Sequence, residues 1–207
     1  MSKTLALVQA LGSKICHDLA GSIGTIDNCL GLLDSKNKAI GEQAKNLVLE
    51  ESKNLVKNIK FFRSIYGLVE SDSRLNIVDM IEMLKGFFAD SAIKFNPHIN
   101  GDLSYIDAHM AKVAYCLVAI ASENIASEGS IDLYINEKND ALFKIQSNGR
   151  DFKLKPECFA VLNGDTAAPL TIKNCREHYA SNICIEHGYK LAVNKNGGST
   201  EYFVIKK

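Results

Sequence analysis

The segment KICHDLAGSIGTIDNCLGLL, residues 14–33, decides the fold of this chain, because it indicates one long amphipathic helix with a histidine in its interior. Apolar residues recur at alternating spacings of three and four through and around this segment: Val8, Leu11, Ile15, Leu19, Ile23, Ile26, Leu30 and Leu33. Such spacing keeps apolar side chains on one helical face. At about 100° per residue, His17 points roughly 180° away from the centre of that face. We therefore expect the imidazole of His17 to be exposed to solvent.

Small residues surround His17 on this outward face. Ser13, Gly21 and Gly24 lie on the same side of the helix as the imidazole. A glycine inside a helix costs about 1 kcal/mol relative to alanine, so helix stability does not explain the two glycines. One interpretation is that the backbone of another protein must come close to His17, and the alternative is an ordinary solvated histidine.

The composition is that of an ordinary globular protein, with 207 residues of which 46% are hydrophobic and 23% charged. Basic and acidic residues are equally numerous, 24 of each, which favours neither nucleic acid nor an anionic membrane as a partner. The N-terminus resembles no signal peptide, and no apolar run approaches the roughly 18 residues of a membrane span. We expect a cytoplasmic protein.

The six cysteines contain no C-x-x-C pair and lie mostly in apolar periodic segments, so we expect small buried hydrophobes rather than a disulfide or zinc framework. Cys16 is the expected exception, because it neighbours His17. The histidines outside this segment lack metal-ligand spacing, and we assign them no chemistry: His98, His109, His178 and His187.

Two long helices are predicted at the N-terminus, over residues 3–34 and about 39–69, joined by a short polar turn. They make an antiparallel hairpin, residues 1–70, whose two apolar stripes a single hairpin cannot cover. Pairing with a second copy into a four-helix bundle covers both, so we expect a homodimer.

From residue 75 to residue 207 the pattern changes to alternating strands and helices, which predicts a second domain and an α+β fold overall. We expect an antiparallel or mixed sheet with helices on one face. The predicted strands are residues 75–78, 92–99, 131–136, 141–146, 189–194 and 200–205, with turns at 138–140 and 196–198. The predicted helices are residues 79–89, 107–127, 157–162 and 171–187, the last ended by Gly188.

The segment CHDLAGSIGTIDNCLGLL, residues 16–33, resembles the phosphoacceptor box of sensor histidine kinases, where an acidic residue follows the histidine on the first dimerisation helix. It most resembles the alphaproteobacterial histidine phosphotransferases of the ChpT type. The closing run EHGYKLAVNKNGGSTEYFVIKK, residues 186–207, is similar to the end of that family's C-terminal domain. The resemblance implies a phosphoacceptor hairpin followed by an α/β sandwich like a degenerate kinase ATP-binding domain.

The residues that a kinase uses for ATP are not matched here. Ser147 stands where an adenine-reading aspartate belongs, and Asp151 replaces the second glycine of an Asp-x-Gly-x-Gly turn. We interpret Asn124 as a surface or capping residue rather than a magnesium ligand. Residues 163–169, NGDTAAP, contain one glycine where a phosphate-binding lid needs several free backbone N–H groups. We expect this chain to bind no ATP, no metal and no other cofactor.

These observations predict that His17 receives a phosphoryl group from the aspartyl phosphate of one receiver domain and passes it to the aspartate of another, with Mg²⁺ held by the receiver. The expected partners are the receiver domains of a hybrid histidine kinase and of response regulators, and the main direction of transfer is left open. Asp18 resembles the acidic neighbour that polarises the other ring nitrogen of the histidine in kinases. The alternative is that it pairs with a nearby lysine, because side chains of adjacent residues on a helix do not face each other. We expect receivers to dock on Ser13, Gly21 and Gly24. Lys53 and Lys57, predicted opposite His17, either steer the acidic receiver rim or form a solvated face.

Two rivals to this hypothesis stay open. One is an autophosphorylating histidine kinase that uses ATP, and the other is an inactive pseudokinase dimer that binds receivers without transferring phosphate.

Overall fold

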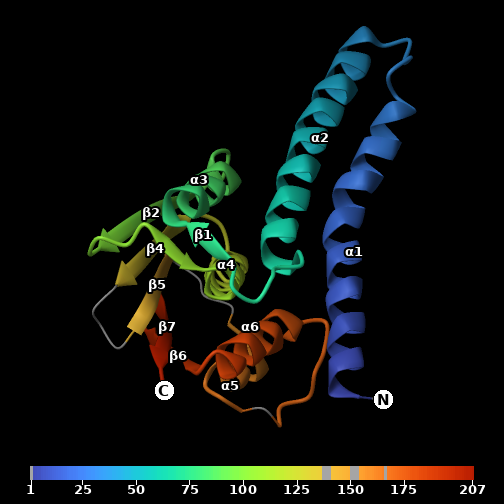
Figure 1. Ribbon diagram of the computed structural model, residues 1–207. Coiled ribbons are helices and arrows are strands. Elements are labelled where there is room, and N and C mark those ends of the chain that lie inside the picture. The colour runs from blue at the N-terminus through green and yellow to red at the C-terminus, as the bar shows by residue number, and fades with distance from the viewer. Residues whose placement is uncertain (1, 137–140, 150–153, 166) are drawn as a thin grey trace.

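The computed structural model describes residues 2–136, 141–149, 154–165 and 167–207, and it begins with an antiparallel hairpin of two long helices (Figure 1). Helix α1 spans Lys3–Leu30 and helix α2 spans Lys38–Tyr66. The side chain of Asn37 caps α2 by accepting a hydrogen bond from the backbone of Ala39, at 3.1 Å. Both helices end three or four residues earlier than predicted, because residues 31–34 form turns and Gly67 adopts an extended backbone.

The rest of the chain folds into a five-stranded mixed sheet and a separate two-stranded sheet. The order in the large sheet is β2-β4-β5-β7-β6, in which β2 and β4 are parallel and the other neighbours are antiparallel. Its strands are β2 (Ile93–Asn100), β4 (Gly129–Asn136), β5 (Ala141–Gly149), β6 (Tyr189–Asn196) and β7 (Ser199–Lys206). The small sheet pairs β1 (Arg74–Asn76) with β3 (Tyr105–Asp107). The predicted mixed sheet and α+β fold are confirmed.

Helices cover one face of the large sheet, as the alternating burial along its strands requires. In β5, Phe143 and Ile145 are fully buried, whereas Lys144 between them is only partly buried. The covering helices are α3 (Ile77–Phe88), α4 (Ala108–Glu123), α5 (Pro156–Leu162) and α6 (Cys175–Glu186). Helix α4 is buried continuously from Met110 to Ala121, so it is the central helix that the sequence predicts.

Two further predicted helix boundaries are wrong for identifiable reasons. Helix α4 ends at Glu123 rather than Ser127, with Asn124 as its C-cap. Helix α6 begins at Cys175 rather than Thr171, because the buried side chain of Asn174 accepts hydrogen bonds from the backbone and hydroxyl of Thr171. At its other end the predicted glycine, Gly188, adopts a positive φ of 76°.

The closing hairpin turns at Gly197, with a φ of 55°, as its sequence predicts. The predicted turn at residues 138–140 lies outside the described residues. Cys16 is exposed and the other five cysteines are buried and free, as expected. In the described part of the chain, no helix combines the length and the apolar character of a membrane span.

The C-terminal end of the hairpin belongs to the same hydrophobic core as the sheet and its helices. Phe61 and Ile65 of α2 are almost completely buried there. The Phe61 ring stacks on Phe87 of α3 with 4.0 Å between centroids and meets the edge of Tyr115 of α4. The division into units 1–70 and 75–207 stays a prediction, and this shared core means that the hairpin is held in a defined place beside α4 and α6 (Figure 1).

Candidate functional site

His17 lies midway along α1, and 82% of its side chain is exposed. The exposure that the helical periodicity predicts is therefore correct. A Cβ atom placed on Gly21 or Gly24 would meet no atom within 4 Å, so the helix surface beside the imidazole is open. Ser13 is exposed as well. The structure thus keeps these residues together on one surface, while their role in docking stays a prediction.

Asp18 contacts both of its predicted alternative partners, a nearby lysine and His17. Its Oδ1 atom accepts a hydrogen bond from the Lys14 ammonium at 2.8 Å and lies 3.4 Å from Nδ1 of His17. The second distance exceeds the roughly 3.2 Å upper end of ordinary N–H···O bonds, so the contact with His17 is weak in this state. The carboxylate nevertheless lies on the Nδ1 side of the imidazole. Nε2 has no hydrogen-bond partner within the described segments.

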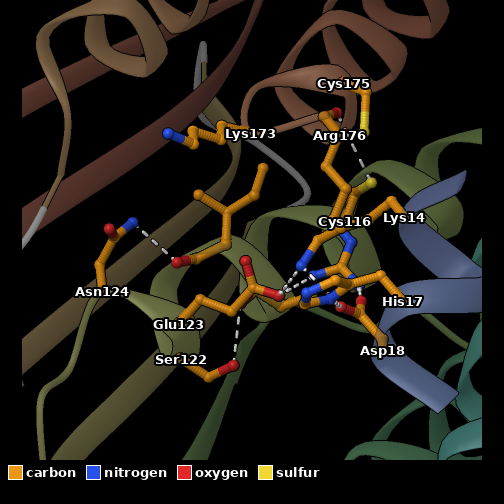
Figure 2. Close-up of polar contacts among 12 residues, drawn as sticks. Lys14, His17, Asp18, Cys116, Ser122, Glu123, Asn124, Lys173, Cys175 and Arg176 are labelled. Carbon is orange, nitrogen blue, oxygen red and sulfur yellow. Dashed lines mark hydrogen bonds and ion pairs between the residues drawn. The ribbon is translucent and has the colours of Figure 1, made fainter. Parts of the chain in front are cut away.

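The other oxygen of Asp18 is bound by an arginine from the far end of the chain. Nη2 of Arg176, the second residue of α6, donates to Oδ2 of Asp18 at 2.7 Å. The same guanidinium donates from Nη1 to Glu123 at the end of α4 and from Nε to the Tyr66 hydroxyl of α2, the latter at 3.0 Å. Figure 2 shows Lys14 and Asp18 of α1 converging on Arg176 and Glu123. Four helices therefore meet at one buried cation.

Arg176 stays charged although only 5% of its side chain is exposed. Burial opposes its charged form, but Tyr66 and Glu123 outweigh burial and raise the pKa of the guanidinium above its ordinary value. Lys14 contacts both carboxylates, at 2.8 Å from Asp18 and 3.3 Å from Glu123. Two cations thus balance two anions in the cluster Lys14, Asp18, Glu123 and Arg176.

A hollow of about 410 Å³ lies in the surface beside His17, and residues of α1, α2, α3, α4 and α6 line it. From α2 it is Asn58, Phe61 and Phe62 that line this hollow. Lys53 and Lys57, predicted to lie opposite His17, do not line it. Side chains on α1 lean toward the helix N-terminus, which in an antiparallel hairpin is the side of the later residues of α2.

Lys53 and Lys57 instead line a neighbouring groove of about 790 Å³ between α2 and α3. The groove shares Phe87 with the hollow beside His17, so the two depressions adjoin. Lys60 lies in the groove with them, and Lys57 approaches Asp90 at 3.8 Å. The lysines are thus near the site but separated from the imidazole.

The segment that corresponds to a kinase's adenine-reading turn belongs to a strand in this structure. Ser147, Asn148 and Gly149 continue β5 past its predicted end at residue 146, because β4 and β7 pair with it on both sides. Ser147 is fully buried, and its hydroxyl donates to the backbone oxygen of Thr200 at 3.3 Å. Asp151, which replaces the second glycine, lies outside the described residues.

Asn124 caps α4, which confirms its interpretation as a capping residue. Its side-chain amide donates to the backbone oxygen of Ile120 at 2.8 Å. It borders a pocket of about 250 Å³ whose charged lining residues are Glu123, Glu177, Lys155 and Lys173. Glu177 is buried, and burial raises the pKa of its carboxyl group.

The described residues contain one group that could hold a metal ion, namely Asp107, His109 and His187. Their ligand atoms all lie within 4.8 Å of one another, and the two imidazole rings stack 4.5 Å apart. Oδ1 of Asp107 already accepts hydrogen bonds from two backbone N–H groups at the start of α4. Because a zinc-like ion needs ligands at about 2.0–2.2 Å, these side chains would have to rotate to bind one.

Sequence reasoning missed Arg176 and Glu123. The sequence offered little signal for either residue, because the run NCREHYASNIC around Arg176 is mostly polar and does not make one arginine stand out. The proximity of His109 and His187 was not predicted either, because no local sequence pattern indicates that α4 packs against α6.

The sequence profile of the histidine phosphotransferase C-terminal domain family matches residues 78–199. The chain belongs to the histidine phosphotransferase family. One relative is the protein phosphotransferase ChpT of Brucella abortus (strain 2308), which is 22% identical over 193 residues, 92% of this chain and 90% of that protein.

Solved structures share the fold of this histidine phosphotransferase. A bacterial phosphotransferase with 20% identity matches 99% of this chain and 98% of its own length, with a TM-score of 0.84. The histidine kinase ThkA, solved in complex with the response regulator protein TrrA, matches 98% of this chain and 63% of its own length, with a TM-score of 0.52 and 16% identity. The resemblance to a histidine kinase therefore holds for the fold.

Proposed function

We propose that this histidine phosphotransferase relays phosphoryl groups between the aspartates of receiver domains, with His17 as the phosphoacceptor. The observation that carries the proposal is the His17 imidazole itself. It is exposed on an open helix surface, its Nδ1 faces the Asp18 carboxylate, and its Nε2 points to no partner in the described parts of the chain.

The transfer needs only one nucleophilic nitrogen from this chain. With the proton on Nδ1, the lone pair of Nε2 attacks the phosphorus of a receiver's aspartyl phosphate. An N–P bond forms, the acyl P–O bond breaks, and the bonding pair leaves with the receiver carboxylate. In the second half-reaction a carboxylate of another receiver attacks the same phosphorus, and the N–P electron pair returns to Nε2. The Asp18 carboxylate stabilises the positive charge that the imidazole ring carries between the two steps.

The receivers of a hybrid histidine kinase and of response regulators are the proposed partners, and each brings its own Mg²⁺. Gly21 and Gly24 allow close approach to His17. Lys53, Lys57 and Lys60 give the α2 side of the adjoining groove a positive charge, which suits the acidic rim of a receiver, whereas its α3 side carries Asp79 and Glu82. The complex of ThkA with TrrA, a kinase of the same fold with a response regulator, supports a partner of this class.

A second copy of this chain is the proposed partner for the apolar faces of the hairpin. Large apolar side chains of both helices are 41–61% exposed, which is unusual for a covered core stripe. They are Leu5, Val8, Ile23 and Leu30 of α1 and Ile40, Leu47 and Ile59 of α2. Two hairpins packed into a four-helix bundle bury them.

We propose further that the chain does not use ATP. The pocket at Asn124 has a volume of only about 250 Å³, below the roughly 300–1,000 Å³ of small-molecule and cofactor sites. Ser147, in the place of an adenine-reading aspartate, turns its hydroxyl to a neighbouring strand.

The function is tested by incubating the purified chain with a receiver domain carrying ³²P on its aspartate and mapping the label. We expect label on His17 and none on the His17→Gln variant. Incubation with γ-labelled ATP distinguishes the autokinase, since label from ATP would contradict this proposal. The pseudokinase predicts receiver binding without label on His17, which would contradict it equally.

A further inference from the structure

Arg176 connects the C-terminal domain to the residue next to the phosphoacceptor, and its position is fixed on every side. It is almost fully buried, with hydrogen bonds to α1, α2 and α4 through Asp18, Tyr66 and Glu123. Its guanidinium carbon also lies 5.7 Å from the centre of the Phe62 ring, the geometry of a cation–π contact. A group held by so many partners defines the orientation of whatever it binds.

What Arg176 orients is the Asp18 carboxylate. A carboxylate can rotate about its terminal bond, but Oδ2 of Asp18 is bound to Arg176 at 2.7 Å. With Oδ2 fixed, Oδ1 is directed toward Lys14 and Nδ1 of His17. Without the arginine, Lys14 alone would hold Asp18, and a flexible ammonium imposes no plane on its partner.

We propose that Arg176 is a positioning residue for phosphotransfer. Through Asp18 it keeps the proton on Nδ1 of His17 and so presents Nε2 to the incoming receiver. The inference rests on the proposed function and deepens it, because it assigns the C-terminal domain a role at the phosphoacceptor. The weak 3.4 Å contact between Nδ1 and Asp18 shortens when the imidazole gains charge in the transfer step.

The test compares Arg176→Lys with the wild type in single-turnover transfer from a phosphorylated receiver, over a range of receiver concentrations. Lysine keeps the positive charge but loses the planar fork that binds Asp18 and Glu123 together. We expect the maximal transfer rate to fall by about 10- to 100-fold, the range found when partners that orient a functional histidine are lost. The receiver concentration that gives half the maximal rate stays unchanged, because Arg176 is buried and does not contact the receiver.

Three further variants separate positioning from general stability. In Asp18→Asn, additional replacement of Arg176 by lysine causes no further loss, since Arg176 acts through Asp18. Tyr66→Phe keeps the arginine and removes one of its bonds, so it retains the fold and lowers the maximal rate less than Arg176→Lys. Arg63→Lys, an exchange at an exposed arginine of the same helix end, leaves the rate at the wild-type value.

The ¹⁵N chemical shifts of His17 give a readout that a merely structural role would not move. We expect the Nδ1–H form to predominate in the wild type and to lose population in Arg176→Lys. If the wild type is labelled on His17 and both Arg176→Lys and Tyr66→Phe transfer at its rate, the inference is overturned and the proposed function stands. A change in half-saturation alone also overturns it, by making Arg176 a docking residue. If the wild type itself takes up no label, the proposed function fails.

Discussion

Replacing Gly21 and Gly24 by alanine separates helix stability from receiver docking. Both positions are helical, and an added Cβ meets nothing within 4 Å, so alanine introduces no clash. Each exchange stabilises the helix by about 1 kcal/mol, and the double variant by about 2 kcal/mol. For a chain of this size that raises Tm by about 4–8 °C at fixed protein concentration.

Phosphotransfer responds in the opposite direction if the glycines are the docking surface. Two methyl groups on a surface that the receiver backbone must approach closely weaken the binding free energy of the receiver by about 1–3 kcal/mol. This lowers the transfer efficiency by about 5- to 150-fold. The assay is single-turnover transfer from a labelled receiver at low receiver concentration, beside thermal unfolding of the same samples. Gly21→Phe, with a larger side chain, lowers transfer further without unfolding the protein.

Gly12→Ala is the matched control. Gly12 is also a helical glycine of α1 with open space around its Cα, and it lies about 140° around the helix from His17. It gives a similar rise in Tm and leaves transfer at the wild-type rate. Transfer at the wild-type rate by the stabilised Gly21→Ala/Gly24→Ala variant would refute the docking argument.

Further predictions concern assembly, the core and pH. Ile23, on the apolar face of α1, is 52% exposed, and Ile23→Asp places a charge there that shifts the protein from dimer to monomer in analytical ultracentrifugation. The control variant Leu68→Asp, at a fully exposed site outside both helices, leaves the dimer intact. Phe61→Ala removes a fully buried ring stacked on Phe87 and lowers the free energy of unfolding by about 3–5 kcal/mol in urea titration; a loss below about 1 kcal/mol would contradict the shared core. Burial raises the pKa of the Glu177 carboxyl group, so above about pH 4.3 the unfolded state releases a proton that the folded state retains. The free energy of unfolding is therefore highest below about pH 4.3 with respect to this group, and it falls as the pH rises toward the folded-state pKa. Glu177→Gln therefore raises Tm more at pH 8 than at pH 5, and an equal rise at both would contradict the assigned protonation.

The features that were predictable from sequence are those encoded by local periodicity. The three- and four-residue spacing around His17 predicted both the long helix and the exposure of the imidazole, because both depend only on helix geometry. The turns at Gly188 and Gly197 followed from the backbone freedom of glycine. The long strands β4 and β5 were predicted for the same reason, since alternating burial has a two-residue period. Strand β3, with only three residues, was missed because it is too short to show that period.

The features that escaped prediction depend on contacts between distant segments. Arg176 and Asp18 are 158 residues apart, and no local pattern states that α6 packs against α1 beside the phosphoacceptor. Counting residues back from the hairpin turn placed Lys53 and Lys57 opposite His17, but the lean of helical side chains brings Asn58 and Phe62 there instead. The extension of β5 through Gly149 likewise depends on strands β4 and β7 pairing on both sides of it.

The central claim is tested most directly by following one labelled phosphoryl group through two receivers in the absence of ATP. A donor receiver phosphorylated with ³²P is mixed with this chain and an unphosphorylated second receiver, and the label on each protein is followed by rapid quenching. If His17 relays the phosphoryl group, label appears on His17 and then on the second receiver, at a rate that His17→Gln reduces to that of the two receivers alone. Label reaching the second receiver equally fast with His17→Gln would contradict a relay through His17.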